Sequence, residues 1–195
     1  MRIGRACTAA LLGLMLLAAG AIAQSPGVQG GESGSMLDTL FAKLQTATDP
    51  VAVQELEQAI WEQWTMLPDE AQRKLMFRGI AEMQQQELES AVATFTRLIE
   101  LAPKVSEGWN KRATLYYTLG EYKKSLADCD EVIKRNPLHF GALSGYGLIY
   151  VQLNQPARAI EYFKRALKIN PNLRGVEESI NVLEQQGKRG RGSYI

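Results

Sequence analysis

Side chains that commonly perform catalysis or hold metal ions are scarce in this sequence. The chain has one histidine, His139, and two cysteines, one of which is Cys129. A zinc site is usually built from four Cys, His or carboxylate ligands, and no second His or neighbouring cysteine accompanies His139. The carboxylates of Asp128, Asp130 and Glu131 could act as general acids or bases, but such a charge run is typical of a solvated helix face. The sequence therefore predicts no catalytic residue, no metal site and no cofactor.

The composition also argues against nucleic acid and membrane surfaces as partners. The chain has 22 Lys and Arg residues against 21 Asp and Glu residues, so it generates no strong field of either sign. Its glycines are not spaced as a phosphate-binding loop between a strand and a helix. These observations favour a binding function over an enzymatic one.

The N-terminus is typical of a secretory signal peptide. Arg2 and Arg5 precede an apolar run over residues 9–22, and the small-residue ending at 21–23 comes directly before the expected cleavage point. An uncleaved membrane anchor is the alternative, but this run of about 14 residues is shorter than the ~20 that a spanning helix needs. We expect cleavage after residue 23, a periplasmic or secreted protein, and no stable membrane insertion afterwards. Residues 24–35, rich in Gly and Ser, are expected to form a flexible linker.

From residue 36 onward the apolar residues recur at three- and four-residue steps, which predicts helices throughout. Several residue types also recur every 34 residues, which is typical of an array of helical hairpins. The columns are Pro103, Pro137 and Pro171; Ala91, Ser125 and Ala159; Phe95, Cys129 and Phe163; Gly79, Ala113 and Gly147; Leu75, Trp109 and Leu143; and Glu82, Tyr116 and Tyr150.

These units resemble the tetratricopeptide repeat (TPR), whose pattern is an aromatic, a small residue, a Tyr, then Ala, an aromatic and Pro. The resemblance covers about 72–173 and implies an all-α fold, a TPR helical-hairpin solenoid (α-α superhelix). The third unit fits best, and the first departs from the pattern where Glu82 replaces Tyr. The predicted division is 36–71, a degenerate N-terminal capping hairpin; 72–105, 106–139 and 140–173, three repeats; 174–187, a C-terminal solvating helix; and 188–195, a basic tail.

The middle repeat shows how the pattern would act physically. Small residues let two helices approach closely, so Ala113 and Ser125 are expected to mark the helix crossing. Gly120 would end the first helix with a positive φ, and Pro137 would stop the second helix. Cys129 shares its column with two phenylalanines and should be buried and unreactive, which disfavours a nucleophilic pair with His139.

The resemblance implies that the first helix of each hairpin lines a concave groove that binds another protein or peptide. The residues expected to face the groove are Arg73, Met76, Ile80, Met83, Gln84, Asn110, Thr114, Tyr117, Thr118, Ser144, Leu148, Val151 and Gln152. Some of them are apolar and would be needlessly exposed without a partner. The alternative is that Met76, Ile80 and Leu148 are covered by a neighbouring hairpin or by the linker.

The chemistry of these positions favours an apolar or amphipathic helical segment as the partner. Some TPR domains grip an acidic C-terminal tail through a ring of Lys, Arg and Asn, but only Asn110 and Lys111 are of a suitable type here. We expect a non-catalytic adaptor or assembly factor. The alternative is an accessory subunit that positions the substrate of an envelope enzyme. The basic tail from Lys188 is expected to be a solvated chain end, with a second interaction segment as the alternative.

Overall fold

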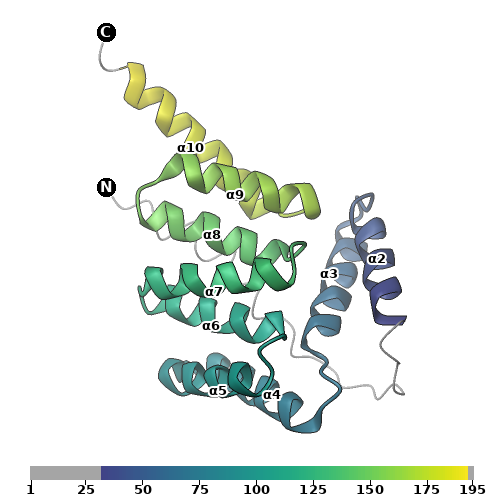
Figure 1. The fold of residues 1–195 in the computed structure, drawn as a ribbon. Coiled ribbons are helices and arrows are strands. Elements are labelled where there is room, and N and C mark those ends of the chain that lie inside the picture. Colours follow the sequence, from purple (N-terminus) through teal and green to yellow (C-terminus); the bar gives the residue numbers. More distant parts are fainter. Residues whose placement is uncertain (1–31, 193–195) are drawn as a thin grey trace.

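The computed structural model describes residues 32–192, and this part of the chain is entirely helical (Figure 1). The signal peptide and most of the linker lie outside the described residues. The helices are α2 (Glu32–Leu44), α3 (Pro50–Thr65), α4 (Glu70–Gln84), α5 (Leu88–Leu101), α6 (Ser106–Thr118), α7 (Tyr122–Arg135), α8 (Phe140–Gln152), α9 (Pro156–Ile169) and α10 (Arg174–Gly192). Two boundaries differ from expectation, because α2 starts at Glu32, inside the predicted linker, and α10 continues beyond Gly187.

Helices α4 to α9 form three antiparallel hairpins stacked in layers, with α10 packed on α9 (Figure 1). A phenylalanine fits against a glycine inside the first and third hairpins. A Cβ added to Gly79 would lie 2.6 Å from the ring of Phe95, and one added to Gly147 would be closer still to Phe163. The recurring small residue is therefore required by the ring that faces it.

The turn inside each hairpin repeats one backbone conformation. Gly120 has a φ of 76°, as the sequence predicts, and the residues one period away, Gln86 and Asn154, have φ values of 61° and 54°. Left-handed backbone carries no steric penalty for glycine but does for other residues. The turn geometry is thus set by the fold of the repeat and imposed even where the sequence does not favour it.

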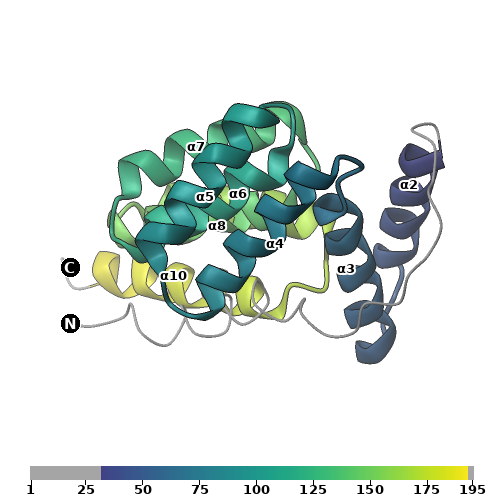
Figure 2. The ribbon, with the colours of Figure 1, turned by 90° about the horizontal axis from the view of Figure 1, so that it is seen from below.

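The N-terminal hairpin covers the side of the stack and does not add a fourth layer on α4. Helices α2 and α3 run steeply across the stacked helices and stand to one side of them (Figures 1 and 2). Leu44, Ile60, Trp61 and Trp64 join the core cluster that also holds Phe140. Figure 2 shows the same arrangement from below, with α2 and α3 beside the stacked helices.

The exposed face of α4 is mixed. Lys74 and Arg78 are exposed on α4 and pair with Glu70 and Glu82 of the same helix, with N–O distances of 2.6 and 2.8 Å. Phe77, between them, is 48% exposed. The apolar side of α3 does not cover this face, since its tryptophans pack on the N-terminal parts of α6 and α8.

Candidate binding groove

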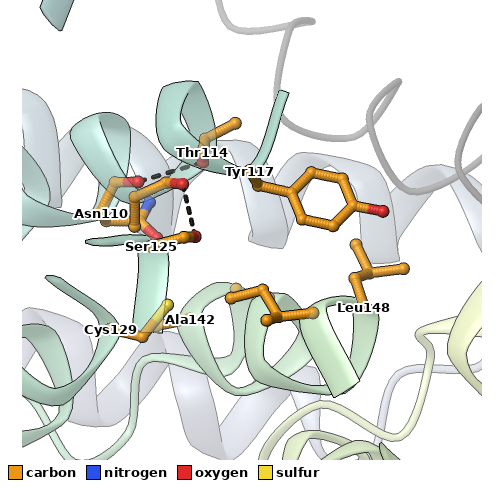
Figure 3. Close-up of a pocket in the computed structure, with 11 residues that line it drawn as sticks. Asn110, Thr114, Tyr117, Ser125, Cys129, Ala142 and Leu148 are labelled. Carbon is orange, nitrogen blue, oxygen red and sulfur yellow. Dashed lines mark hydrogen bonds between the residues drawn. The ribbon is translucent and has the colours of Figure 1, made fainter. Parts of the chain in front are cut away.

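A pocket opens between α6, α7 and α8 in the middle of the stack (Figure 3). Its walls combine small residues with a few larger side chains and one thiol. The lining residues are Asn110, Ala113, Thr114, Tyr117, Ser125, Cys129, Gly141, Ala142, Gly145, Leu148 and Ile149. Figure 3 shows Tyr117 and Leu148 on one side of this space and Asn110, Ser125 and Cys129 on the other.

The pocket lies where the repeat pattern is broken. Cys129 stands in the column that Phe95 and Phe163 fill in the other hairpins, and Ala113 faces it in place of glycine. A thiol occupies far less volume than a phenyl ring, so the space beside Cys129 is not closed. A Cβ added to Gly145 would still lie 3.7 Å from the Cys129 sulfur, an ordinary contact distance.

The helix crossing and the state of the thiol match the sequence predictions. The Ser125 hydroxyl donates to the Ala113 carbonyl oxygen at 2.7 Å (Figure 3), which joins α7 to α6 at their closest approach. Cys129 is 2% exposed. Burial, with smaller contributions from Asp128 and Asp130, raises the pKa of its thiol, so the thiolate that would make it reactive is disfavoured.

Four of the predicted groove residues, Asn110, Thr114, Tyr117 and Leu148, line the pocket. Tyr117 is half-buried, with its ring centroid 5.8 Å from that of Tyr122. Its hydroxyl accepts a hydrogen bond from Gln152 Nε2 at 3.3 Å. The structure thus places one aromatic side chain of the predicted groove at the pocket and supports it from α7 and α8.

Other predicted groove residues have different roles. Met76 is fully buried in the core of the first hairpin, and the Arg73 guanidinium donates to the carbonyl oxygens of Leu67 and Pro68 at 2.8 and 3.1 Å. Met76 was therefore misassigned as exposed, and Arg73 fixes the connection between α3 and α4. Ser144 is buried and donates to the Phe140 carbonyl oxygen of its own helix at 2.9 Å.

The remaining predicted positions surround these residues without forming a single site. Ile80 and Met83 are half-buried against the first hairpin's core, and Val151 is half-buried against the larger core cluster. Gln84 is exposed. The Thr118 hydroxyl donates to the Thr114 carbonyl oxygen at 3.0 Å. Met76 and Leu148 are buried and Ile80 is half-buried, so none of the three is an exposed apolar side chain.

A buried polar cluster beside the pocket escaped the sequence analysis. Glu107 and His139 are fully buried, and Lys111 is 7% exposed. Glu107 pairs with Lys111 Nζ at 3.0 Å and accepts from Asn110 Nδ2 at 3.2 Å. The only sequence signal was the spacing of Glu107 and Lys111 on one helix face, because His139 joins them from the start of α8, 32 positions further along the chain.

His139 also caps α8, and this hydrogen bond determines which ring nitrogen carries the proton. Its Nδ1 accepts a hydrogen bond from the Ala142 N–H at 3.1 Å, so the ring proton lies on Nε2, which is 2.9 Å from Glu107 Oε2. Burial alone would raise the pKa of Glu107, but the Lys111 charge and the hydrogen bond from His139 lower it to about 2. The cluster is therefore a carboxylate–ammonium pair braced by a neutral imidazole.

Two tryptophans of α3 cover this cluster. The Trp64 ring stacks on His139, with centroids 4.2 Å apart and planes 18° apart. Trp61 lies 5.5 Å from His139 and 5.6 Å from Phe140 in edge-on geometry, and Lys111 Nζ lies 5.1 Å from the centre of the Trp61 ring. The sequence patterns do not predict that either tryptophan packs on this surface.

Within residues 32–192 no cluster of His, Cys, Asp and Glu side chains could hold a metal ion. Over the same residues, no helix combines the length and apolar character needed to span a membrane. The arrangement offers an apolar recess beside a polar cluster, which can bind a side chain of another molecule.

Comparison with known proteins agrees with the repeat pattern and the fold. The family profile described as Tetratricopeptide repeat matches residues 110–173. A TPR repeat-containing protein of Rhizobium etli is 30% identical over 150 residues, which cover 77% of this chain and 74% of the relative. An Hsp70-Hsp90 organizing protein of Glycine max is 28% identical over 129 residues, 66% of this chain but 22% of that longer protein.

Solved structures with the same fold include complexes and free proteins. The first TPR of Spaghetti bound to an HSP90 peptide superposes with a TM-score of 0.57 and 20% identity, covering 59% of this chain and 91% of that one. MamA gives a TM-score of 0.57 with 17% identity over 83% of this chain and 86% of its own. The chain belongs to the tetratricopeptide repeat family.

Proposed function

We propose that this protein is an interaction adaptor that holds a segment of a partner protein over the pocket between α6 and α8. The observation that carries this proposal is the recess left by Cys129 in the phenylalanine column, lined by Tyr117 and Leu148. A recess of this kind accepts one apolar side chain, which acts as an anchor in peptide recognition. The structures of relatives named as bound to HSP90 or Hsp70 peptides support a protein or peptide partner.

An apolar anchor suits the pocket better than an acidic tail. The two residues suited to gripping a carboxylate, Asn110 and Lys111, already bind Glu107. A partner carboxylate would have to compete with that buried carboxylate. We therefore favour an apolar or amphipathic partner segment, helical over its contact region.

The test compares capture of partners by two forms of the mature protein. The first form is wild type, and the second combines Cys129→Phe with Ala113→Gly, which fills the pocket with a ring and restores the glycine opposite it. A protein from an envelope extract that binds wild type directly, and binds the filled form at least tenfold less, supports the proposal. If the captured protein is an enzyme, the accessory role is favoured. Equal binding to both forms would place the interface elsewhere.

Tyr117 and Tyr116 provide a matched pair on adjacent positions of α6. Tyr117→Ala should weaken partner binding by about 1–3 kcal/mol, as loss of an aromatic anchor does. Tyr116 lies outside the pocket lining, with Arg112 and Lys124 over its ring at 5.6 and 5.3 Å, so Tyr116→Ala should spare binding. Because Tyr117 also packs on Tyr122, its replacement costs some stability as well, and thermal melting of both variants separates the two effects.

We further propose that the protein is exported and loses residues 1–23. The proposal is supported by the N-terminal pattern of basic residues, an apolar run and small residues. Mass spectrometry of the native protein tests it: a chain beginning at Gln24 agrees with export, and a chain that retains the first residues contradicts it.

A further inference from the structure

The surface beneath α3 is shaped for aromatic rings. It is formed by the N-terminal parts of α6 and α8, with Lys111, His139, Phe140 and Gly141 in contact with the two tryptophans. A Cβ added to Gly141 would lie 2.7 Å from a ring carbon of Trp61. The absence of a side chain at this position is therefore needed for the ring to lie on α8.

The surface also needs a cover over its buried charges. Glu107 and Lys111 are buried beneath the rings, and buried charges depend on a complete set of partners. Helix α3 meets the surface with Trp61 and Trp64, and Glu57 accepts from Asn170 Nδ2 across the interface at 2.5 Å. The other two glutamates of α3 are exposed, so the match lies in two aromatic residues three positions apart and not in the charge of the helix.

The cover is joined to the stack by few polar contacts. Besides the Glu57 contact, Gln45 Nε2 donates to the Lys168 carbonyl oxygen at 3.0 Å, and Asn172 Nδ2 donates to that of Leu44 at 3.0 Å. The chain leaves α3 through residues 66–69 before α4 begins. Trp61 and Trp64 lie in the C-terminal turns of α3, next to this connection, and the contacts of Leu44 and Gln45 lie at the other end of the helix. A hairpin that stands outside the repeat stack and is held by these few contacts can open without unfolding the repeats.

One polar group of the cover is left unsatisfied. Trp61 is 7% exposed, and its indole Nε1 has no hydrogen-bond partner among the described residues. A buried N–H without an acceptor destabilises the closed arrangement relative to one that supplies an acceptor. The contact with α3 is therefore well matched in shape and incomplete in hydrogen bonding.

We propose that α3 is an exchangeable occupant of this surface and that a partner protein displaces it with a helix bearing two aromatic residues three positions apart. This inference rests on the proposed adaptor function, since it names the class of partner and the element that regulates access to the groove. When the partner helix binds, the α2–α3 hairpin swings away about Met66, which is exposed, while Arg73 continues to hold Leu67 and Pro68. The closed hairpin thereby blocks helices that lack this aromatic pair.

The experiment uses a fluorescently labelled peptide of residues 50–65, the sequence of α3, as the probe. The receptor is the full mature chain, either wild type or carrying Trp61→Ala and Trp64→Ala, which releases the internal occupant. Fluorescence anisotropy should show at least tenfold tighter binding to the double variant. A peptide with both tryptophans replaced by alanine should bind at least tenfold more weakly than the α3 peptide, and Gly141→Val in the double variant should remove binding.

Equal, weak binding of the α3 peptide to wild type and double variant overturns the proposal, as does equal binding of the peptide without tryptophans. If the double variant does not fold, hydrogen exchange of wild type decides. Protection of α3 amides at least tenfold below that of α6 and α8 amides supports exchange, and protection equal to theirs contradicts it. Filling the pocket by Cys129→Phe with Ala113→Gly should leave binding of the α3 peptide intact, because the peptide binds the surface beneath α3 and not the pocket. Failure of the adaptor proposal is therefore distinguishable from failure of the exchange of α3.

Discussion

Replacing Cys129 by phenylalanine tests whether the pocket arises from the break in the repeat column. In the first hairpin a Cβ added opposite Phe95 would meet three ring atoms at 2.6 to 2.9 Å. Ala113 carries that Cβ in the middle hairpin, so Cys129→Phe alone forces its ring against a methyl group. Overpacking of this kind costs about 1–3 kcal/mol of the free energy of unfolding.

Removing the methyl group should reverse the effect. Ala113→Gly alone costs about 1 kcal/mol, because glycine is a poorer helix former than alanine. In the double variant the new ring gains a site of the kind that Gly79 gives Phe95, and burial of a phenyl side chain contributes about 1.5–3 kcal/mol. We expect the double variant to lie within about 1 kcal/mol of wild type and the two changes to couple by about 1–3 kcal/mol.

Urea unfolding followed by circular dichroism measures the free energy of unfolding of wild type, the two single variants and the double variant. The matched control is Cys129→Ala, which keeps the pocket open and should leave the effect of Ala113→Gly unchanged. If the effects of Cys129→Phe and Ala113→Gly simply add, within about 0.5 kcal/mol, the two side chains do not face each other as described, and the origin of the pocket must be sought elsewhere.

Three further predictions concern burial, charge and backbone. The pKa of Glu107 is lowered from 4.5 to about 2, so its contribution to stability is complete above about pH 4.5 and is lost as the pH falls towards 2. Glu107→Gln should cost about 3–5 kcal/mol of the free energy of unfolding at neutral pH, because it leaves Lys111 buried without its partner. When the free energy of unfolding is measured against pH, the variant should also show a smaller loss of stability between pH 4.5 and 2. Gln86→Gly should stabilise the protein by about 0.5–1 kcal/mol in the same assay, since Gln86 has a φ of 61°, and no gain would show that the turn is not strained. Cys129 should react with thiol reagents only on unfolding, because it is 2% exposed and its pKa is raised; rapid labelling of the native protein would contradict the burial.

The sequence predicts the repeats well because their determinants are local. The period of 34 residues carries its own small residues, turns and proline stops, and each acts within one hairpin or on its neighbour. Gly120 adopts its positive φ, and Cys129 and Ser125 are buried as their columns require. Such features follow from the residue itself and the one that it faces.

The position of the N-terminal hairpin could not be predicted in this way. An apolar stripe shows that one face of α3 must be buried, but it does not identify the surface that buries it. The outer face of α4 gives no clue, because Phe77 is exposed there beside the charged Lys74 and Arg78. The contacts of Trp61 and Trp64 with His139 join residues more than seventy positions apart, and no repeat pattern encodes them.

The groove was predicted as a face of each first helix, and the structure places a pocket at the middle of it. In the first repeat, Met76 is packed into the hairpin core, and Arg73 is held by the connection to α3. Helical periodicity indicates the direction in which a side chain points, but not how deeply its neighbours bury it. The depth between α6 and α8 depends on a missing ring in α7, which is a property of three helices together.

Asn110 connects the pocket with the surface that α3 covers. It lines the pocket, and its amide donates to Glu107, whose other contacts are Lys111 and His139 beneath the two tryptophans. A side chain entering the pocket beside Asn110 therefore meets a residue already oriented by the cluster, and release of α3 removes the cover from that cluster. The two proposed binding events share one hydrogen-bonded network, so occupancy of either surface can alter the affinity of the other through Asn110 without any change in the stacking of the repeats.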